Sequence, residues 1–541
     1  MNRPGVFSHR NCIVMLLGLV LLHVSLNYWV LKTNRLPPFG DDALQAITSL
    51  DIYESVTRGP FSGIYYTGGD YPGLHAIYGA VWLLLFDGDP LALQMSNTLF
   101  LAILVFSMYG IGSVLHSRTA GVVSAVVVCS FPNVFGLSRV FYFDYPFMCS
   151  LAFAVYAMLK TGMFRSRIWA AVFGFAAGLS ASLKPTLAVY IAGPLAMFTY
   201  LSWRGRHSGI FANILVALAV FFITAAPFYL PNIGSIYGHA KMAISAELTS
   251  DGTLGPVAGF VRGLHFYVIS LAAYQILLFF SVLFLVALVT HILHGRGGLL
   301  LAWFFPPLIV FGNLYNNLDI RYMLPALPAI ALMISVFACR AGRYRRVLLA
   351  VIIAAALAQT ILITASFDHS ILGSVNRELG FAMISKHTFM HDAYGPDPGM
   401  VYEMGLYYPV QYDWRVGDIV GVLKQYEDPS RRETCLVSYS MLGMALGYSL
   451  RVRGIGVDVY YGDPFLDRWS ASEYADFVIK TDRDIGSRSS IDAAVLVNEA
   501  WIHRVSLQDF AQVGEVQYPE TKLMIYKSAD SNLKHSSIRQ A

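Results

Sequence analysis

Charged residues are scarce in this chain. Asp, Glu, Lys and Arg make up 13% of its 541 residues, compared with about 25% in soluble domains. Hydrophobic residues make up 56%, and the mean hydropathy is +0.54. The sequence therefore predicts an α-helical polytopic membrane protein with some soluble part. The net charge of +4 is too small to indicate nucleic acid as a partner.

Cysteine and nucleotide motifs are also missing. The five cysteines form no C-x-x-C pair, which argues against a disulfide framework and a cysteine metal site. No G-x-G-x-x-G motif follows a predicted strand and opens a helix, so we expect no nucleotide cofactor. Residues 12–31 form an apolar run without a convincing small-residue cleavage site, and we expect it to be retained as a span.

Long apolar runs fill the first two-thirds of the chain. Using roughly 17–25 apolar residues per span, we predict about eleven transmembrane helices, some of them short or interrupted by Gly and Pro. They cover residues 11–31, 92–114, 121–138, 145–162, 168–183, 185–203, 210–230, 266–293, 299–314, 321–339 and 346–366. Residues 73–87 are expected to form a helix that lies in the membrane interface.

Basic residues concentrate in one set of connections. This set contains Arg10, Arg118, Lys160, the Arg204–Arg206 turn and the Arg340–Arg346 turn, and the positive-inside rule makes it cytoplasmic. The N-terminus is then cytoplasmic. The external segments are residues 36–90, 139–144, 231–265 and 315–320, and everything after 366.

Residues 367–541 differ from the rest of the chain. Charge rises there, and five short β-rich runs appear, some separated by helical stretches. These runs are residues 434–440, 454–461, 474–482, 510–519 and 521–528. We therefore divide the chain into a membrane domain, residues 1–366, and a small extracytoplasmic α/β domain, residues 367–541.

Acidic residues mark the predicted external face. Asp41 and Asp42 precede an amphipathic helix in the first external loop, and Asp70 lies further along it. One of the pair is as well explained as a helix cap, which leaves the other unexplained. Asp144 begins a span, where a cap or a turn before Pro146 is the simpler interpretation.

Basic residues and one histidine lie on the same predicted face. Lys184 and Arg321 either lift their charges to the interface or bind a phosphate. Arg139, five residues before Asp144, either pairs with it or binds an anionic headgroup. His265 is structural on its own, but carboxylates from other loops would make it a ligand for zinc or manganese.

The order of these motifs resembles a known group of enzymes. It runs through the acidic pair, "SRVFYFDYPFMCSLAFAVYAML", "GFAAGLSASLKPTLAVY", "GLHFYVISLAAYQILL" and "RYMLPALPAIALM". Over residues 10–366 the chain resembles the C-type (GT-C) membrane glycosyltransferases that use polyprenyl-phosphate sugars. It is most similar to the protein O-mannosyltransferase, aminoarabinose transferase and Rgt-like galacturonosyltransferase group, and it lacks the Trp-Trp-Asp motif of oligosaccharyltransferases.

The resemblance implies roles for individual residues. Asp41 would be the leading catalytic acid, with Asp42 second and Asp144 matching the acid after the third span. Asp70 and His265 would hold a divalent metal, as in some relatives. Tyr71 would lie at the donor phosphate, where it replaces a basic residue of the family, so Lys184, Arg139 or Arg321 would have to supply the positive charge there.

The function implied is transfer of one sugar, with inversion, from a polyprenyl-phosphate donor to an acceptor glycan, lipid or protein outside the membrane. Two other classes stay open at this point. A lipid-linked sugar flippase or transporter would also carry intramembrane charges and broken helices, although no two-half repeat is visible. The other class is a non-catalytic scaffold with a receptor-like external domain.

Overall fold

The computed structural model describes most of the membrane domain and part of the C-terminal region. The described residues are 8–33, 38, 40–58, 72–204, 209–234, 236–238, 241, 256–295, 297–314, 318–364, 416–426, 433–437, 440–455, 457–461, 477–481, 510–517 and 522–528. The chain forms two compact units, Met1–Thr33 with Glu54–Pro409 and Asn34–Tyr53 with Val410–Ala541, and each is described by itself. The predicted boundary between residues 366 and 367 lies outside the described residues.

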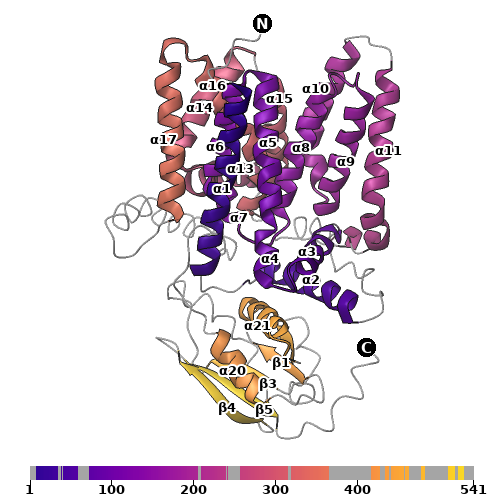
Figure 1. The fold of residues 1–541 in the computed structure, drawn as a ribbon, viewed down its shortest axis with the longest axis vertical. Coiled ribbons are helices and arrows are strands. Elements are labelled where there is room, and N and C mark those ends of the chain that lie inside the picture. The colour runs from indigo at the N-terminus through magenta and orange to yellow at the C-terminus, as the bar shows by residue number, and fades with distance from the viewer. Residues whose placement is uncertain are drawn as a thin grey trace. The chain divides into compact units, whose positions relative to one another are not determined.

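The first unit is helical (Figure 1). Its elements are α1 (His9–Thr33), α3 (Leu74–Leu85), α4 (Pro90–Met95), α5 (Asn97–Leu115), α6 (Arg118–Ser130), α7 (Pro132–Leu137), α8 (Asp144–Lys160), α9 (Arg167–Leu183), α10 (Leu187–Arg204), α11 (Ile210–Tyr229), η2 (Leu230–Asn232), α13 (Pro256–Ser270), the π-helical turn η3 (Leu271–Gln275), α14 (Leu277–Leu293), α15 (Gly298–Gly312), η4 (Ile320–Ala326), α16 (Leu327–Arg340), η5 (Gly342–Tyr344) and α17 (Arg345–Thr364).

Several helices are long and apolar enough to cross a bilayer. Within the described residues, five pass a test of length and hydropathy, and α14 with α15 would make a sixth if that bent pair were one span. The five are His9–Thr33, Pro90–Leu115, Ile210–Asn232, Ile320–Arg340 and Gly342–Ile361. The predicted count of eleven spans stays a prediction, because helices such as α8 and α9 have 17 residues each.

Two predicted spans are interrupted in the structure. Residues 121–138 form α6 and α7, and α7 starts at Pro132, a residue well suited to the first turn of a helix. Residues 266–293 include the end of α13, the π-helical turn η3 and then α14. Leu277, at the start of α14, has a φ of 63°, so the chain changes direction there instead of continuing as one helix.

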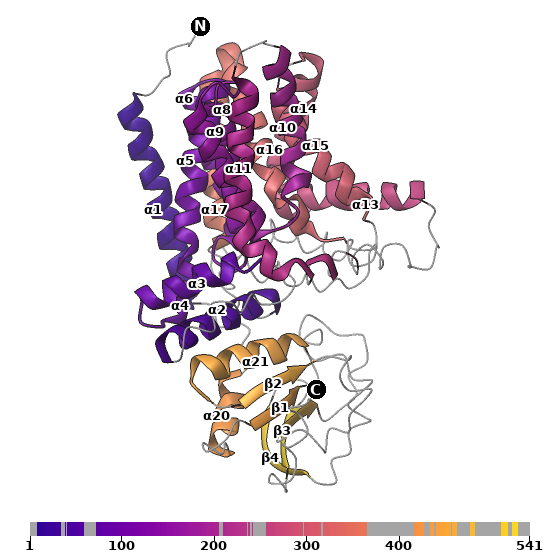
Figure 2. The same ribbon diagram turned by 90° about the vertical axis from the view of Figure 1, so that its right-hand side faces the viewer.

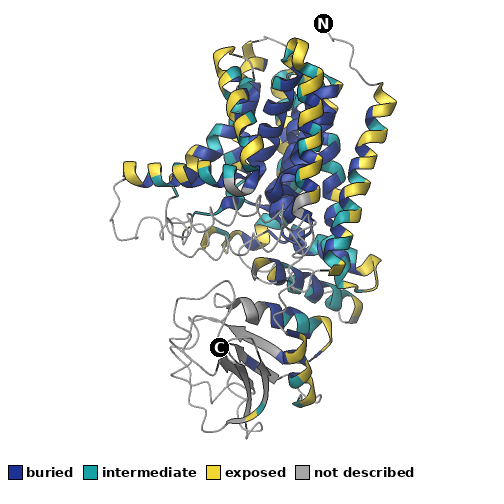
Figure 3. Ribbon diagram, turned by 90° about the vertical axis from the view of Figure 1, so that its left-hand side faces the viewer, coloured by how far each residue is buried: buried dark blue, intermediate teal, exposed yellow. Residues whose placement is uncertain are grey.

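Helices α8 and α16 lie in the core of the first unit. Helix α8 packs between α5 and α9, and α16 contacts α6, α14 and α15. Most residues of α8 and α16 are buried, whereas α11 and α17 carry many exposed positions. Figure 3 shows buried residues in the interior of the helical bundle and exposed residues on its outside. Small residues allow close helix contacts. A Cβ added to Gly174 of α9 would lie 2.1 Å from the carbonyl oxygen of Ala217 on α11.

In its described residues, the second unit contains a five-stranded mixed sheet. All five strand predictions are confirmed: β1 (Glu433–Val437), β2 (Val457–Tyr461), β3 (Phe477–Thr481), β4 (Phe510–Gln517) and β5 (Lys522–Ser528). The order is β2-β1-β3-β5-β4. Strand β1 is parallel to β2 and β3, pairing Cys435 with Val459 and Phe477, and β5 is antiparallel to β3 and β4.

Two helices pack against this sheet. Helix α20 (Val416–Tyr426) contacts β4, and α21 (Ser440–Val452) contacts β1 and β2 (Figure 2). Val416, Ile419, Val420 and Leu423 are buried on α20, which is the spacing of one apolar helix face. In the same unit, Arg451 of α21 forms an ion pair with Asp51, which ties the segment containing the acidic pair to the sheet-bearing part of the unit.

Candidate functional site

A buried ion pair joins the ends of two core helices. Lys184 Nζ lies 2.5 Å from Asp144 Oδ1, and the side chains are 8% and 1% exposed. Lys184 follows α9 and precedes Pro185, which disfavours helical backbone in the residue before it. Its φ and ψ are −148° and 127°, so the chain leaves the helix there. Because the amine is buried against Asp144, the snorkelling interpretation of Lys184 is wrong.

Asp144 is neither a helix cap nor a partner of Arg139. It is the first residue of α8, and its cap residue Phe143 makes no side-chain capping bond. The ion pair of Asp144 is made with Lys184 instead. The two alternatives predicted from the sequence, a helix cap and an ion pair with Arg139, are therefore wrong.

A second ion pair lies at the start of η4. Arg321 donates from Nη2 and Nε to Asp319 Oδ2 at 2.6 and 2.9 Å, and Asp319 Oδ1 accepts from the Arg321 backbone at 2.8 Å. Their side chains are 15–16% exposed, so Arg321 is held by a carboxylate and does not simply reach toward the interface.

Aromatic rings connect the two pairs. Lys184 Nζ lies 5.4 Å from the ring centroids of both Phe143 and Tyr322, and the Arg321 guanidinium lies 4.9 Å from that of Tyr142. Such distances allow cation–π attraction. The adjacent residues Tyr142 and Phe143 thus each contact one cation. We call Asp144, Lys184, Asp319 and Arg321 the two-pair cluster.

The electrostatics also link the two pairs. Burial alone would raise the pKa of Asp319, but the charge and hydrogen bonds of Arg321, with the charge of Lys184, hold that pKa below its usual value. Asp319 therefore stays ionised at neutral pH. With two cations and two carboxylates, the two-pair cluster has no net charge, which limits the cost of burying it.

Tyr190 fixes the position of Tyr322. Its hydroxyl donates to the Tyr322 carbonyl at 2.7 Å, and Phe311 stacks on Tyr322 with centroids 4.8 Å apart. No site role was predicted from the sequence for Tyr142, Phe143, Tyr190 or Tyr322. The aromatic density of "VFYFDYPF" around Asp144 was the available signal.

Arg139 is buried separately from these ion pairs. It is 3% exposed, its guanidinium lies 3.9 Å from the centroid of the Phe135 ring, and Nε donates to the Phe135 carbonyl at 3.4 Å. His23 meets the same ring edge-on with centroids 5.1 Å apart. In the part of the chain that the structure describes, neither terminal nitrogen of Arg139 has a hydrogen-bond partner.

The acidic pair lies inside a helix instead of before it. Helix α2 (Gly40–Arg58) starts before the pair, not after it as predicted, so Asp41 and Asp42 occupy its first turn. The helix dipole favours acids at these positions. Asp42 is buried and its Oδ1 accepts from the Ala43 backbone at 2.9 Å, whereas Asp41 is exposed. A site shared by Asp41, Asp42 and the two-pair cluster stays a prediction.

The metal prediction rests partly on undescribed positions. Asp70 and Tyr71 lie outside the described residues, and His265 occupies an exposed position on α13. Among the residues that are described, no group of three His, Cys, Asp or Glu side chains is arranged to hold a metal ion. The Asp70 and His265 pair therefore stays a prediction.

Known proteins share this fold. A family model, dolichyl-phosphate-mannose-protein mannosyltransferase, matches residues 72–230. The apo structure of ArnT from Cupriavidus metallidurans is 13% identical, with 96% of this chain and 98% of that chain covered and a TM-score of 0.62. ArnT bound to undecaprenyl phosphate is also 13% identical, with 97% of this chain and 99% of that chain covered and a TM-score of 0.60. The archaeal oligosaccharyltransferase AglB from Archaeoglobus fulgidus is 11% identical, with 86% of this chain and 69% of that chain covered and a TM-score of 0.51.

The resemblance to the C-type membrane glycosyltransferases is confirmed for the fold. No sequence among curated proteins matched this chain significantly. The chain is an integral membrane protein with the C-type fold. The segment matched by the family model contains Arg139, Asp144 and Lys184, whereas Asp41, His265 and Arg321 lie outside it.

Proposed function

We propose that this chain is a membrane glycosyltransferase that moves a single sugar from a polyprenyl-phosphate donor to an acceptor glycan, lipid or protein on the extracytoplasmic side. The observation that carries the proposal is the two-pair cluster, which holds Lys184 and Arg321 in fixed positions among aromatic rings. The family model names a dolichyl-phosphate-mannose donor. The ArnT and AglB structures contain undecaprenyl phosphate and a dolichol-phosphate.

The two-pair cluster suits a phosphate leaving group. When the bond between the sugar and the phosphate breaks, negative charge grows on the phosphate oxygen. Cations already held in place stabilise that charge without having to rearrange. Asp144 and Asp319 hold Lys184 and Arg321 in their orientations in the resting protein. A resident carboxylate also competes for each cation, so we expect the phosphate to weaken one of the ion pairs when it binds.

Arg139 is a third cation that could bind the donor phosphate. A buried cation whose hydrogen bonds are incomplete is costly, and an ionisable group inside a membrane bundle is by default a candidate for function. Among the described residues, its terminal nitrogens have no hydrogen-bond partner. A guanidinium is well shaped to bind phosphate oxygens in pairs, so we assign Arg139 to an anionic part of the donor.

We assign Asp41 as the general base of the reaction. An acceptor oxygen or nitrogen attacks the anomeric carbon while the carbon–oxygen bond to the phosphate breaks, and configuration at that carbon inverts. The electron pair of that bond leaves with the lipid phosphate, and the acceptor's proton goes to the Asp41 carboxylate. The exposure of Asp41 and the burial of Asp42 favour Asp41 as the group that reaches the acceptor, with Asp42 in support.

The remaining roles complete the proposal. Tyr71 would contact the donor phosphate, and a divalent metal, if the enzyme uses one, would be held by Asp70 and His265. The N-terminus would be cytoplasmic. Removing metal with a chelator and measuring both bound metal and turnover tests the metal role, and His265→Ala should lower both.

One assay tests the function. Purified protein in detergent, without any gradient, is incubated with a polyprenyl-phosphate donor that carries a radiolabelled sugar and with a membrane extract as the source of acceptor. A transferase moves label to the acceptor, whereas a flippase or a scaffold does not. The double variant Lys184→Met with Asp144→Leu provides the matched inactive control.

A further inference from the structure

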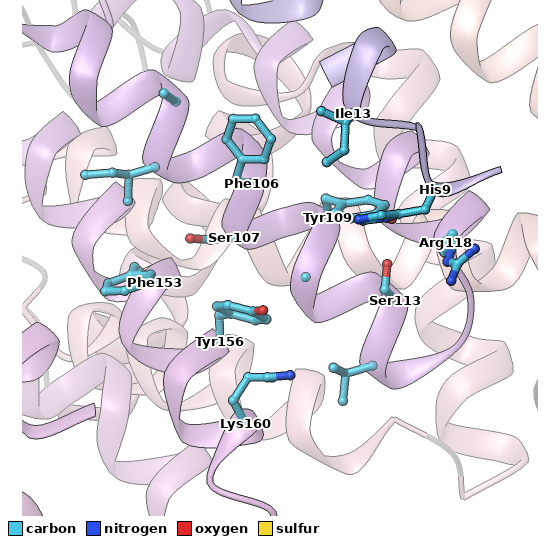
Figure 4. Close-up of a pocket in the computed structure, with 14 residues that line it drawn as sticks. His9, Ile13, Phe106, Ser107, Tyr109, Ser113, Arg118, Phe153, Tyr156 and Lys160 are labelled. Carbon is cyan, nitrogen blue, oxygen red and sulfur yellow. The ribbon is translucent and has the colours of Figure 1, made fainter. Parts of the chain in front are cut away.

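A cavity of about 760 Å³ lies between α1, α5, α6 and α8 (Figure 4). Its volume falls within the roughly 300–1,000 Å³ of typical ligand pockets. Lys160, which lines it, is the last residue of α8, and Asp144 is the first. Since α8 has 17 residues, its two ends are about 24 Å apart. The cavity is therefore separate from the two-pair cluster.

The cavity has one basic side and one apolar side. His9, Arg118 and Lys160 line one part, and Phe106 and Phe153 line another (Figure 4). None of the described residues that line it is acidic. The ion pairs found between described residues involve neither Arg118 nor Lys160. The cavity thus combines positive charge with an apolar wall.

The three basic residues of the cavity all lie at helix ends. His9 begins α1, Arg118 begins α6 and Lys160 ends α8. His9 stacks on Tyr109, with Nδ1 3.0 Å from the tyrosine hydroxyl, and Lys160 Nζ lies 5.4 Å from the Trp169 ring centroid. These aromatic contacts hold His9 and Lys160 in place at their helix ends.

The apolar wall runs from the rim toward the middle of the bundle. Phe153 lies seven residues before Lys160 on α8, which is about 10 Å along the helix. Gly110 of α5 lets the Tyr156 ring of α8 pack close to the α5 backbone, because a Cβ at this position would lie 2.3 Å from that ring. Val114, also part of the lining, is 50% exposed. An elongated amphiphile fits this shape better than a small soluble anion.

We propose that this cavity binds one anionic glycerophospholipid of the bilayer, with its phosphate against Arg118 and Lys160 and an acyl chain along Phe106 and Phe153. Charge complementarity selects the anionic headgroup, because basic pockets between transmembrane helices bind such lipids. The site lies at the opposite end of α8 from the proposed donor site, so this lipid is not the sugar donor.

Native mass spectrometry of the delipidated full-length protein tests the proposal, with phosphatidylglycerol and phosphatidylcholine as probes. The double variant Arg118→Gln with Lys160→Gln should bind phosphatidylglycerol at least about tenfold more weakly. The control, Arg204→Gln with Arg346→Gln, removes two exposed cations that do not line the cavity and should bind it normally. Equal binding of the two lipids by the unaltered protein, or unchanged phosphatidylglycerol binding in the double variant, would overturn the proposal.

A second variant guards against a folding defect. Ala102→Trp keeps Arg118 and Lys160 but fills part of the cavity with the larger side chain. It should also lose phosphatidylglycerol binding while melting at a similar temperature. Retained binding in Ala102→Trp contradicts the proposed seat of the acyl chain. Undecaprenyl phosphate should not displace phosphatidylglycerol, and displacement at equal concentration would assign the cavity to the donor instead. Sugar transfer by the double variant is measured separately, so the two proposals can fail independently.

Discussion

The Nζ atom of Lys184 lies 2.5 Å from Oδ1 of Asp144, although 40 positions separate the two residues in the chain. The contact exists because α8 begins where α9 ends and the two helices pack against each other. Both side chains are buried, so neither can be removed without leaving an opposite charge in a place with little water.

Lys184→Met should therefore abolish activity and destabilise the protein. Removing one partner of a buried ion pair typically costs about 3–5 kcal/mol. Adding Asp144→Leu removes the stranded carboxylate, and the double variant should recover most of the lost stability but no turnover. Thermal unfolding and sugar transfer measured on all three variants separate the two effects. Turnover in the double variant would show that the pair has only a structural role.

Arg139→Met should affect the donor more than the fold. Because its terminal nitrogens have no hydrogen-bond partner among the described residues, a methionine of similar length avoids burying a guanidinium with incomplete hydrogen bonding. We expect an unchanged or higher melting temperature, together with a KM for the lipid donor raised about tenfold or more. Arg139→Lys should recover part of the affinity, since it restores charge without the planar shape. A lower melting temperature with an unchanged KM would assign Arg139 to packing.

The Asp319 carboxylate should make stability depend on pH on the acidic side. Its pKa in the folded protein is below the reference value of 3.8, so the folded state binds this proton less readily than the unfolded state does. The resulting stabilisation is complete above the unfolded pKa and is lost as the pH falls through the folded pKa. The free energy of unfolding between pH 7 and pH 3 should fall more steeply for the native protein than for Asp319→Asn. Parallel curves would mean that Asp319 does not have this role.

The sequence was sufficient for the regular elements and for naming most of the charged residues. All five strands and the apolar helices could be predicted because they depend on short-range patterns of residues along the chain. Pairing was not predictable, because the contact between Asp144 and Lys184 depends on how two helices pack. Arg139 was the nearer candidate partner in the chain. The breaks near Pro132 and Leu277 were missed because hydropathy averages over a whole window and does not register a local change of backbone direction.

The proposed orientation predicts which side of the membrane each loop faces. Single cysteines placed in residues 36–90 and in the final domain should react with a membrane-impermeant thiol reagent in intact cells, because the basic turns are cytoplasmic. A cysteine in the Arg340–Arg346 turn should react only after the cells are broken. The five native cysteines are buried, so background labelling should be low. Protection of the final domain would reverse the orientation.

The rate of sugar transfer by Asp41→Asn, compared with the native protein and with Asp42→Asn, tests the central claim most directly. The native protein should transfer labelled sugar from the polyprenyl-phosphate donor. Asp41→Asn should be slower by about 10²–10⁴-fold, the usual cost of losing a general base. Its stability should fall by only about 0.3–1 kcal/mol, because an acid in the first turn of α2 is lost. Absence of transfer by the native protein, or near-native turnover by Asp41→Asn, would contradict the account.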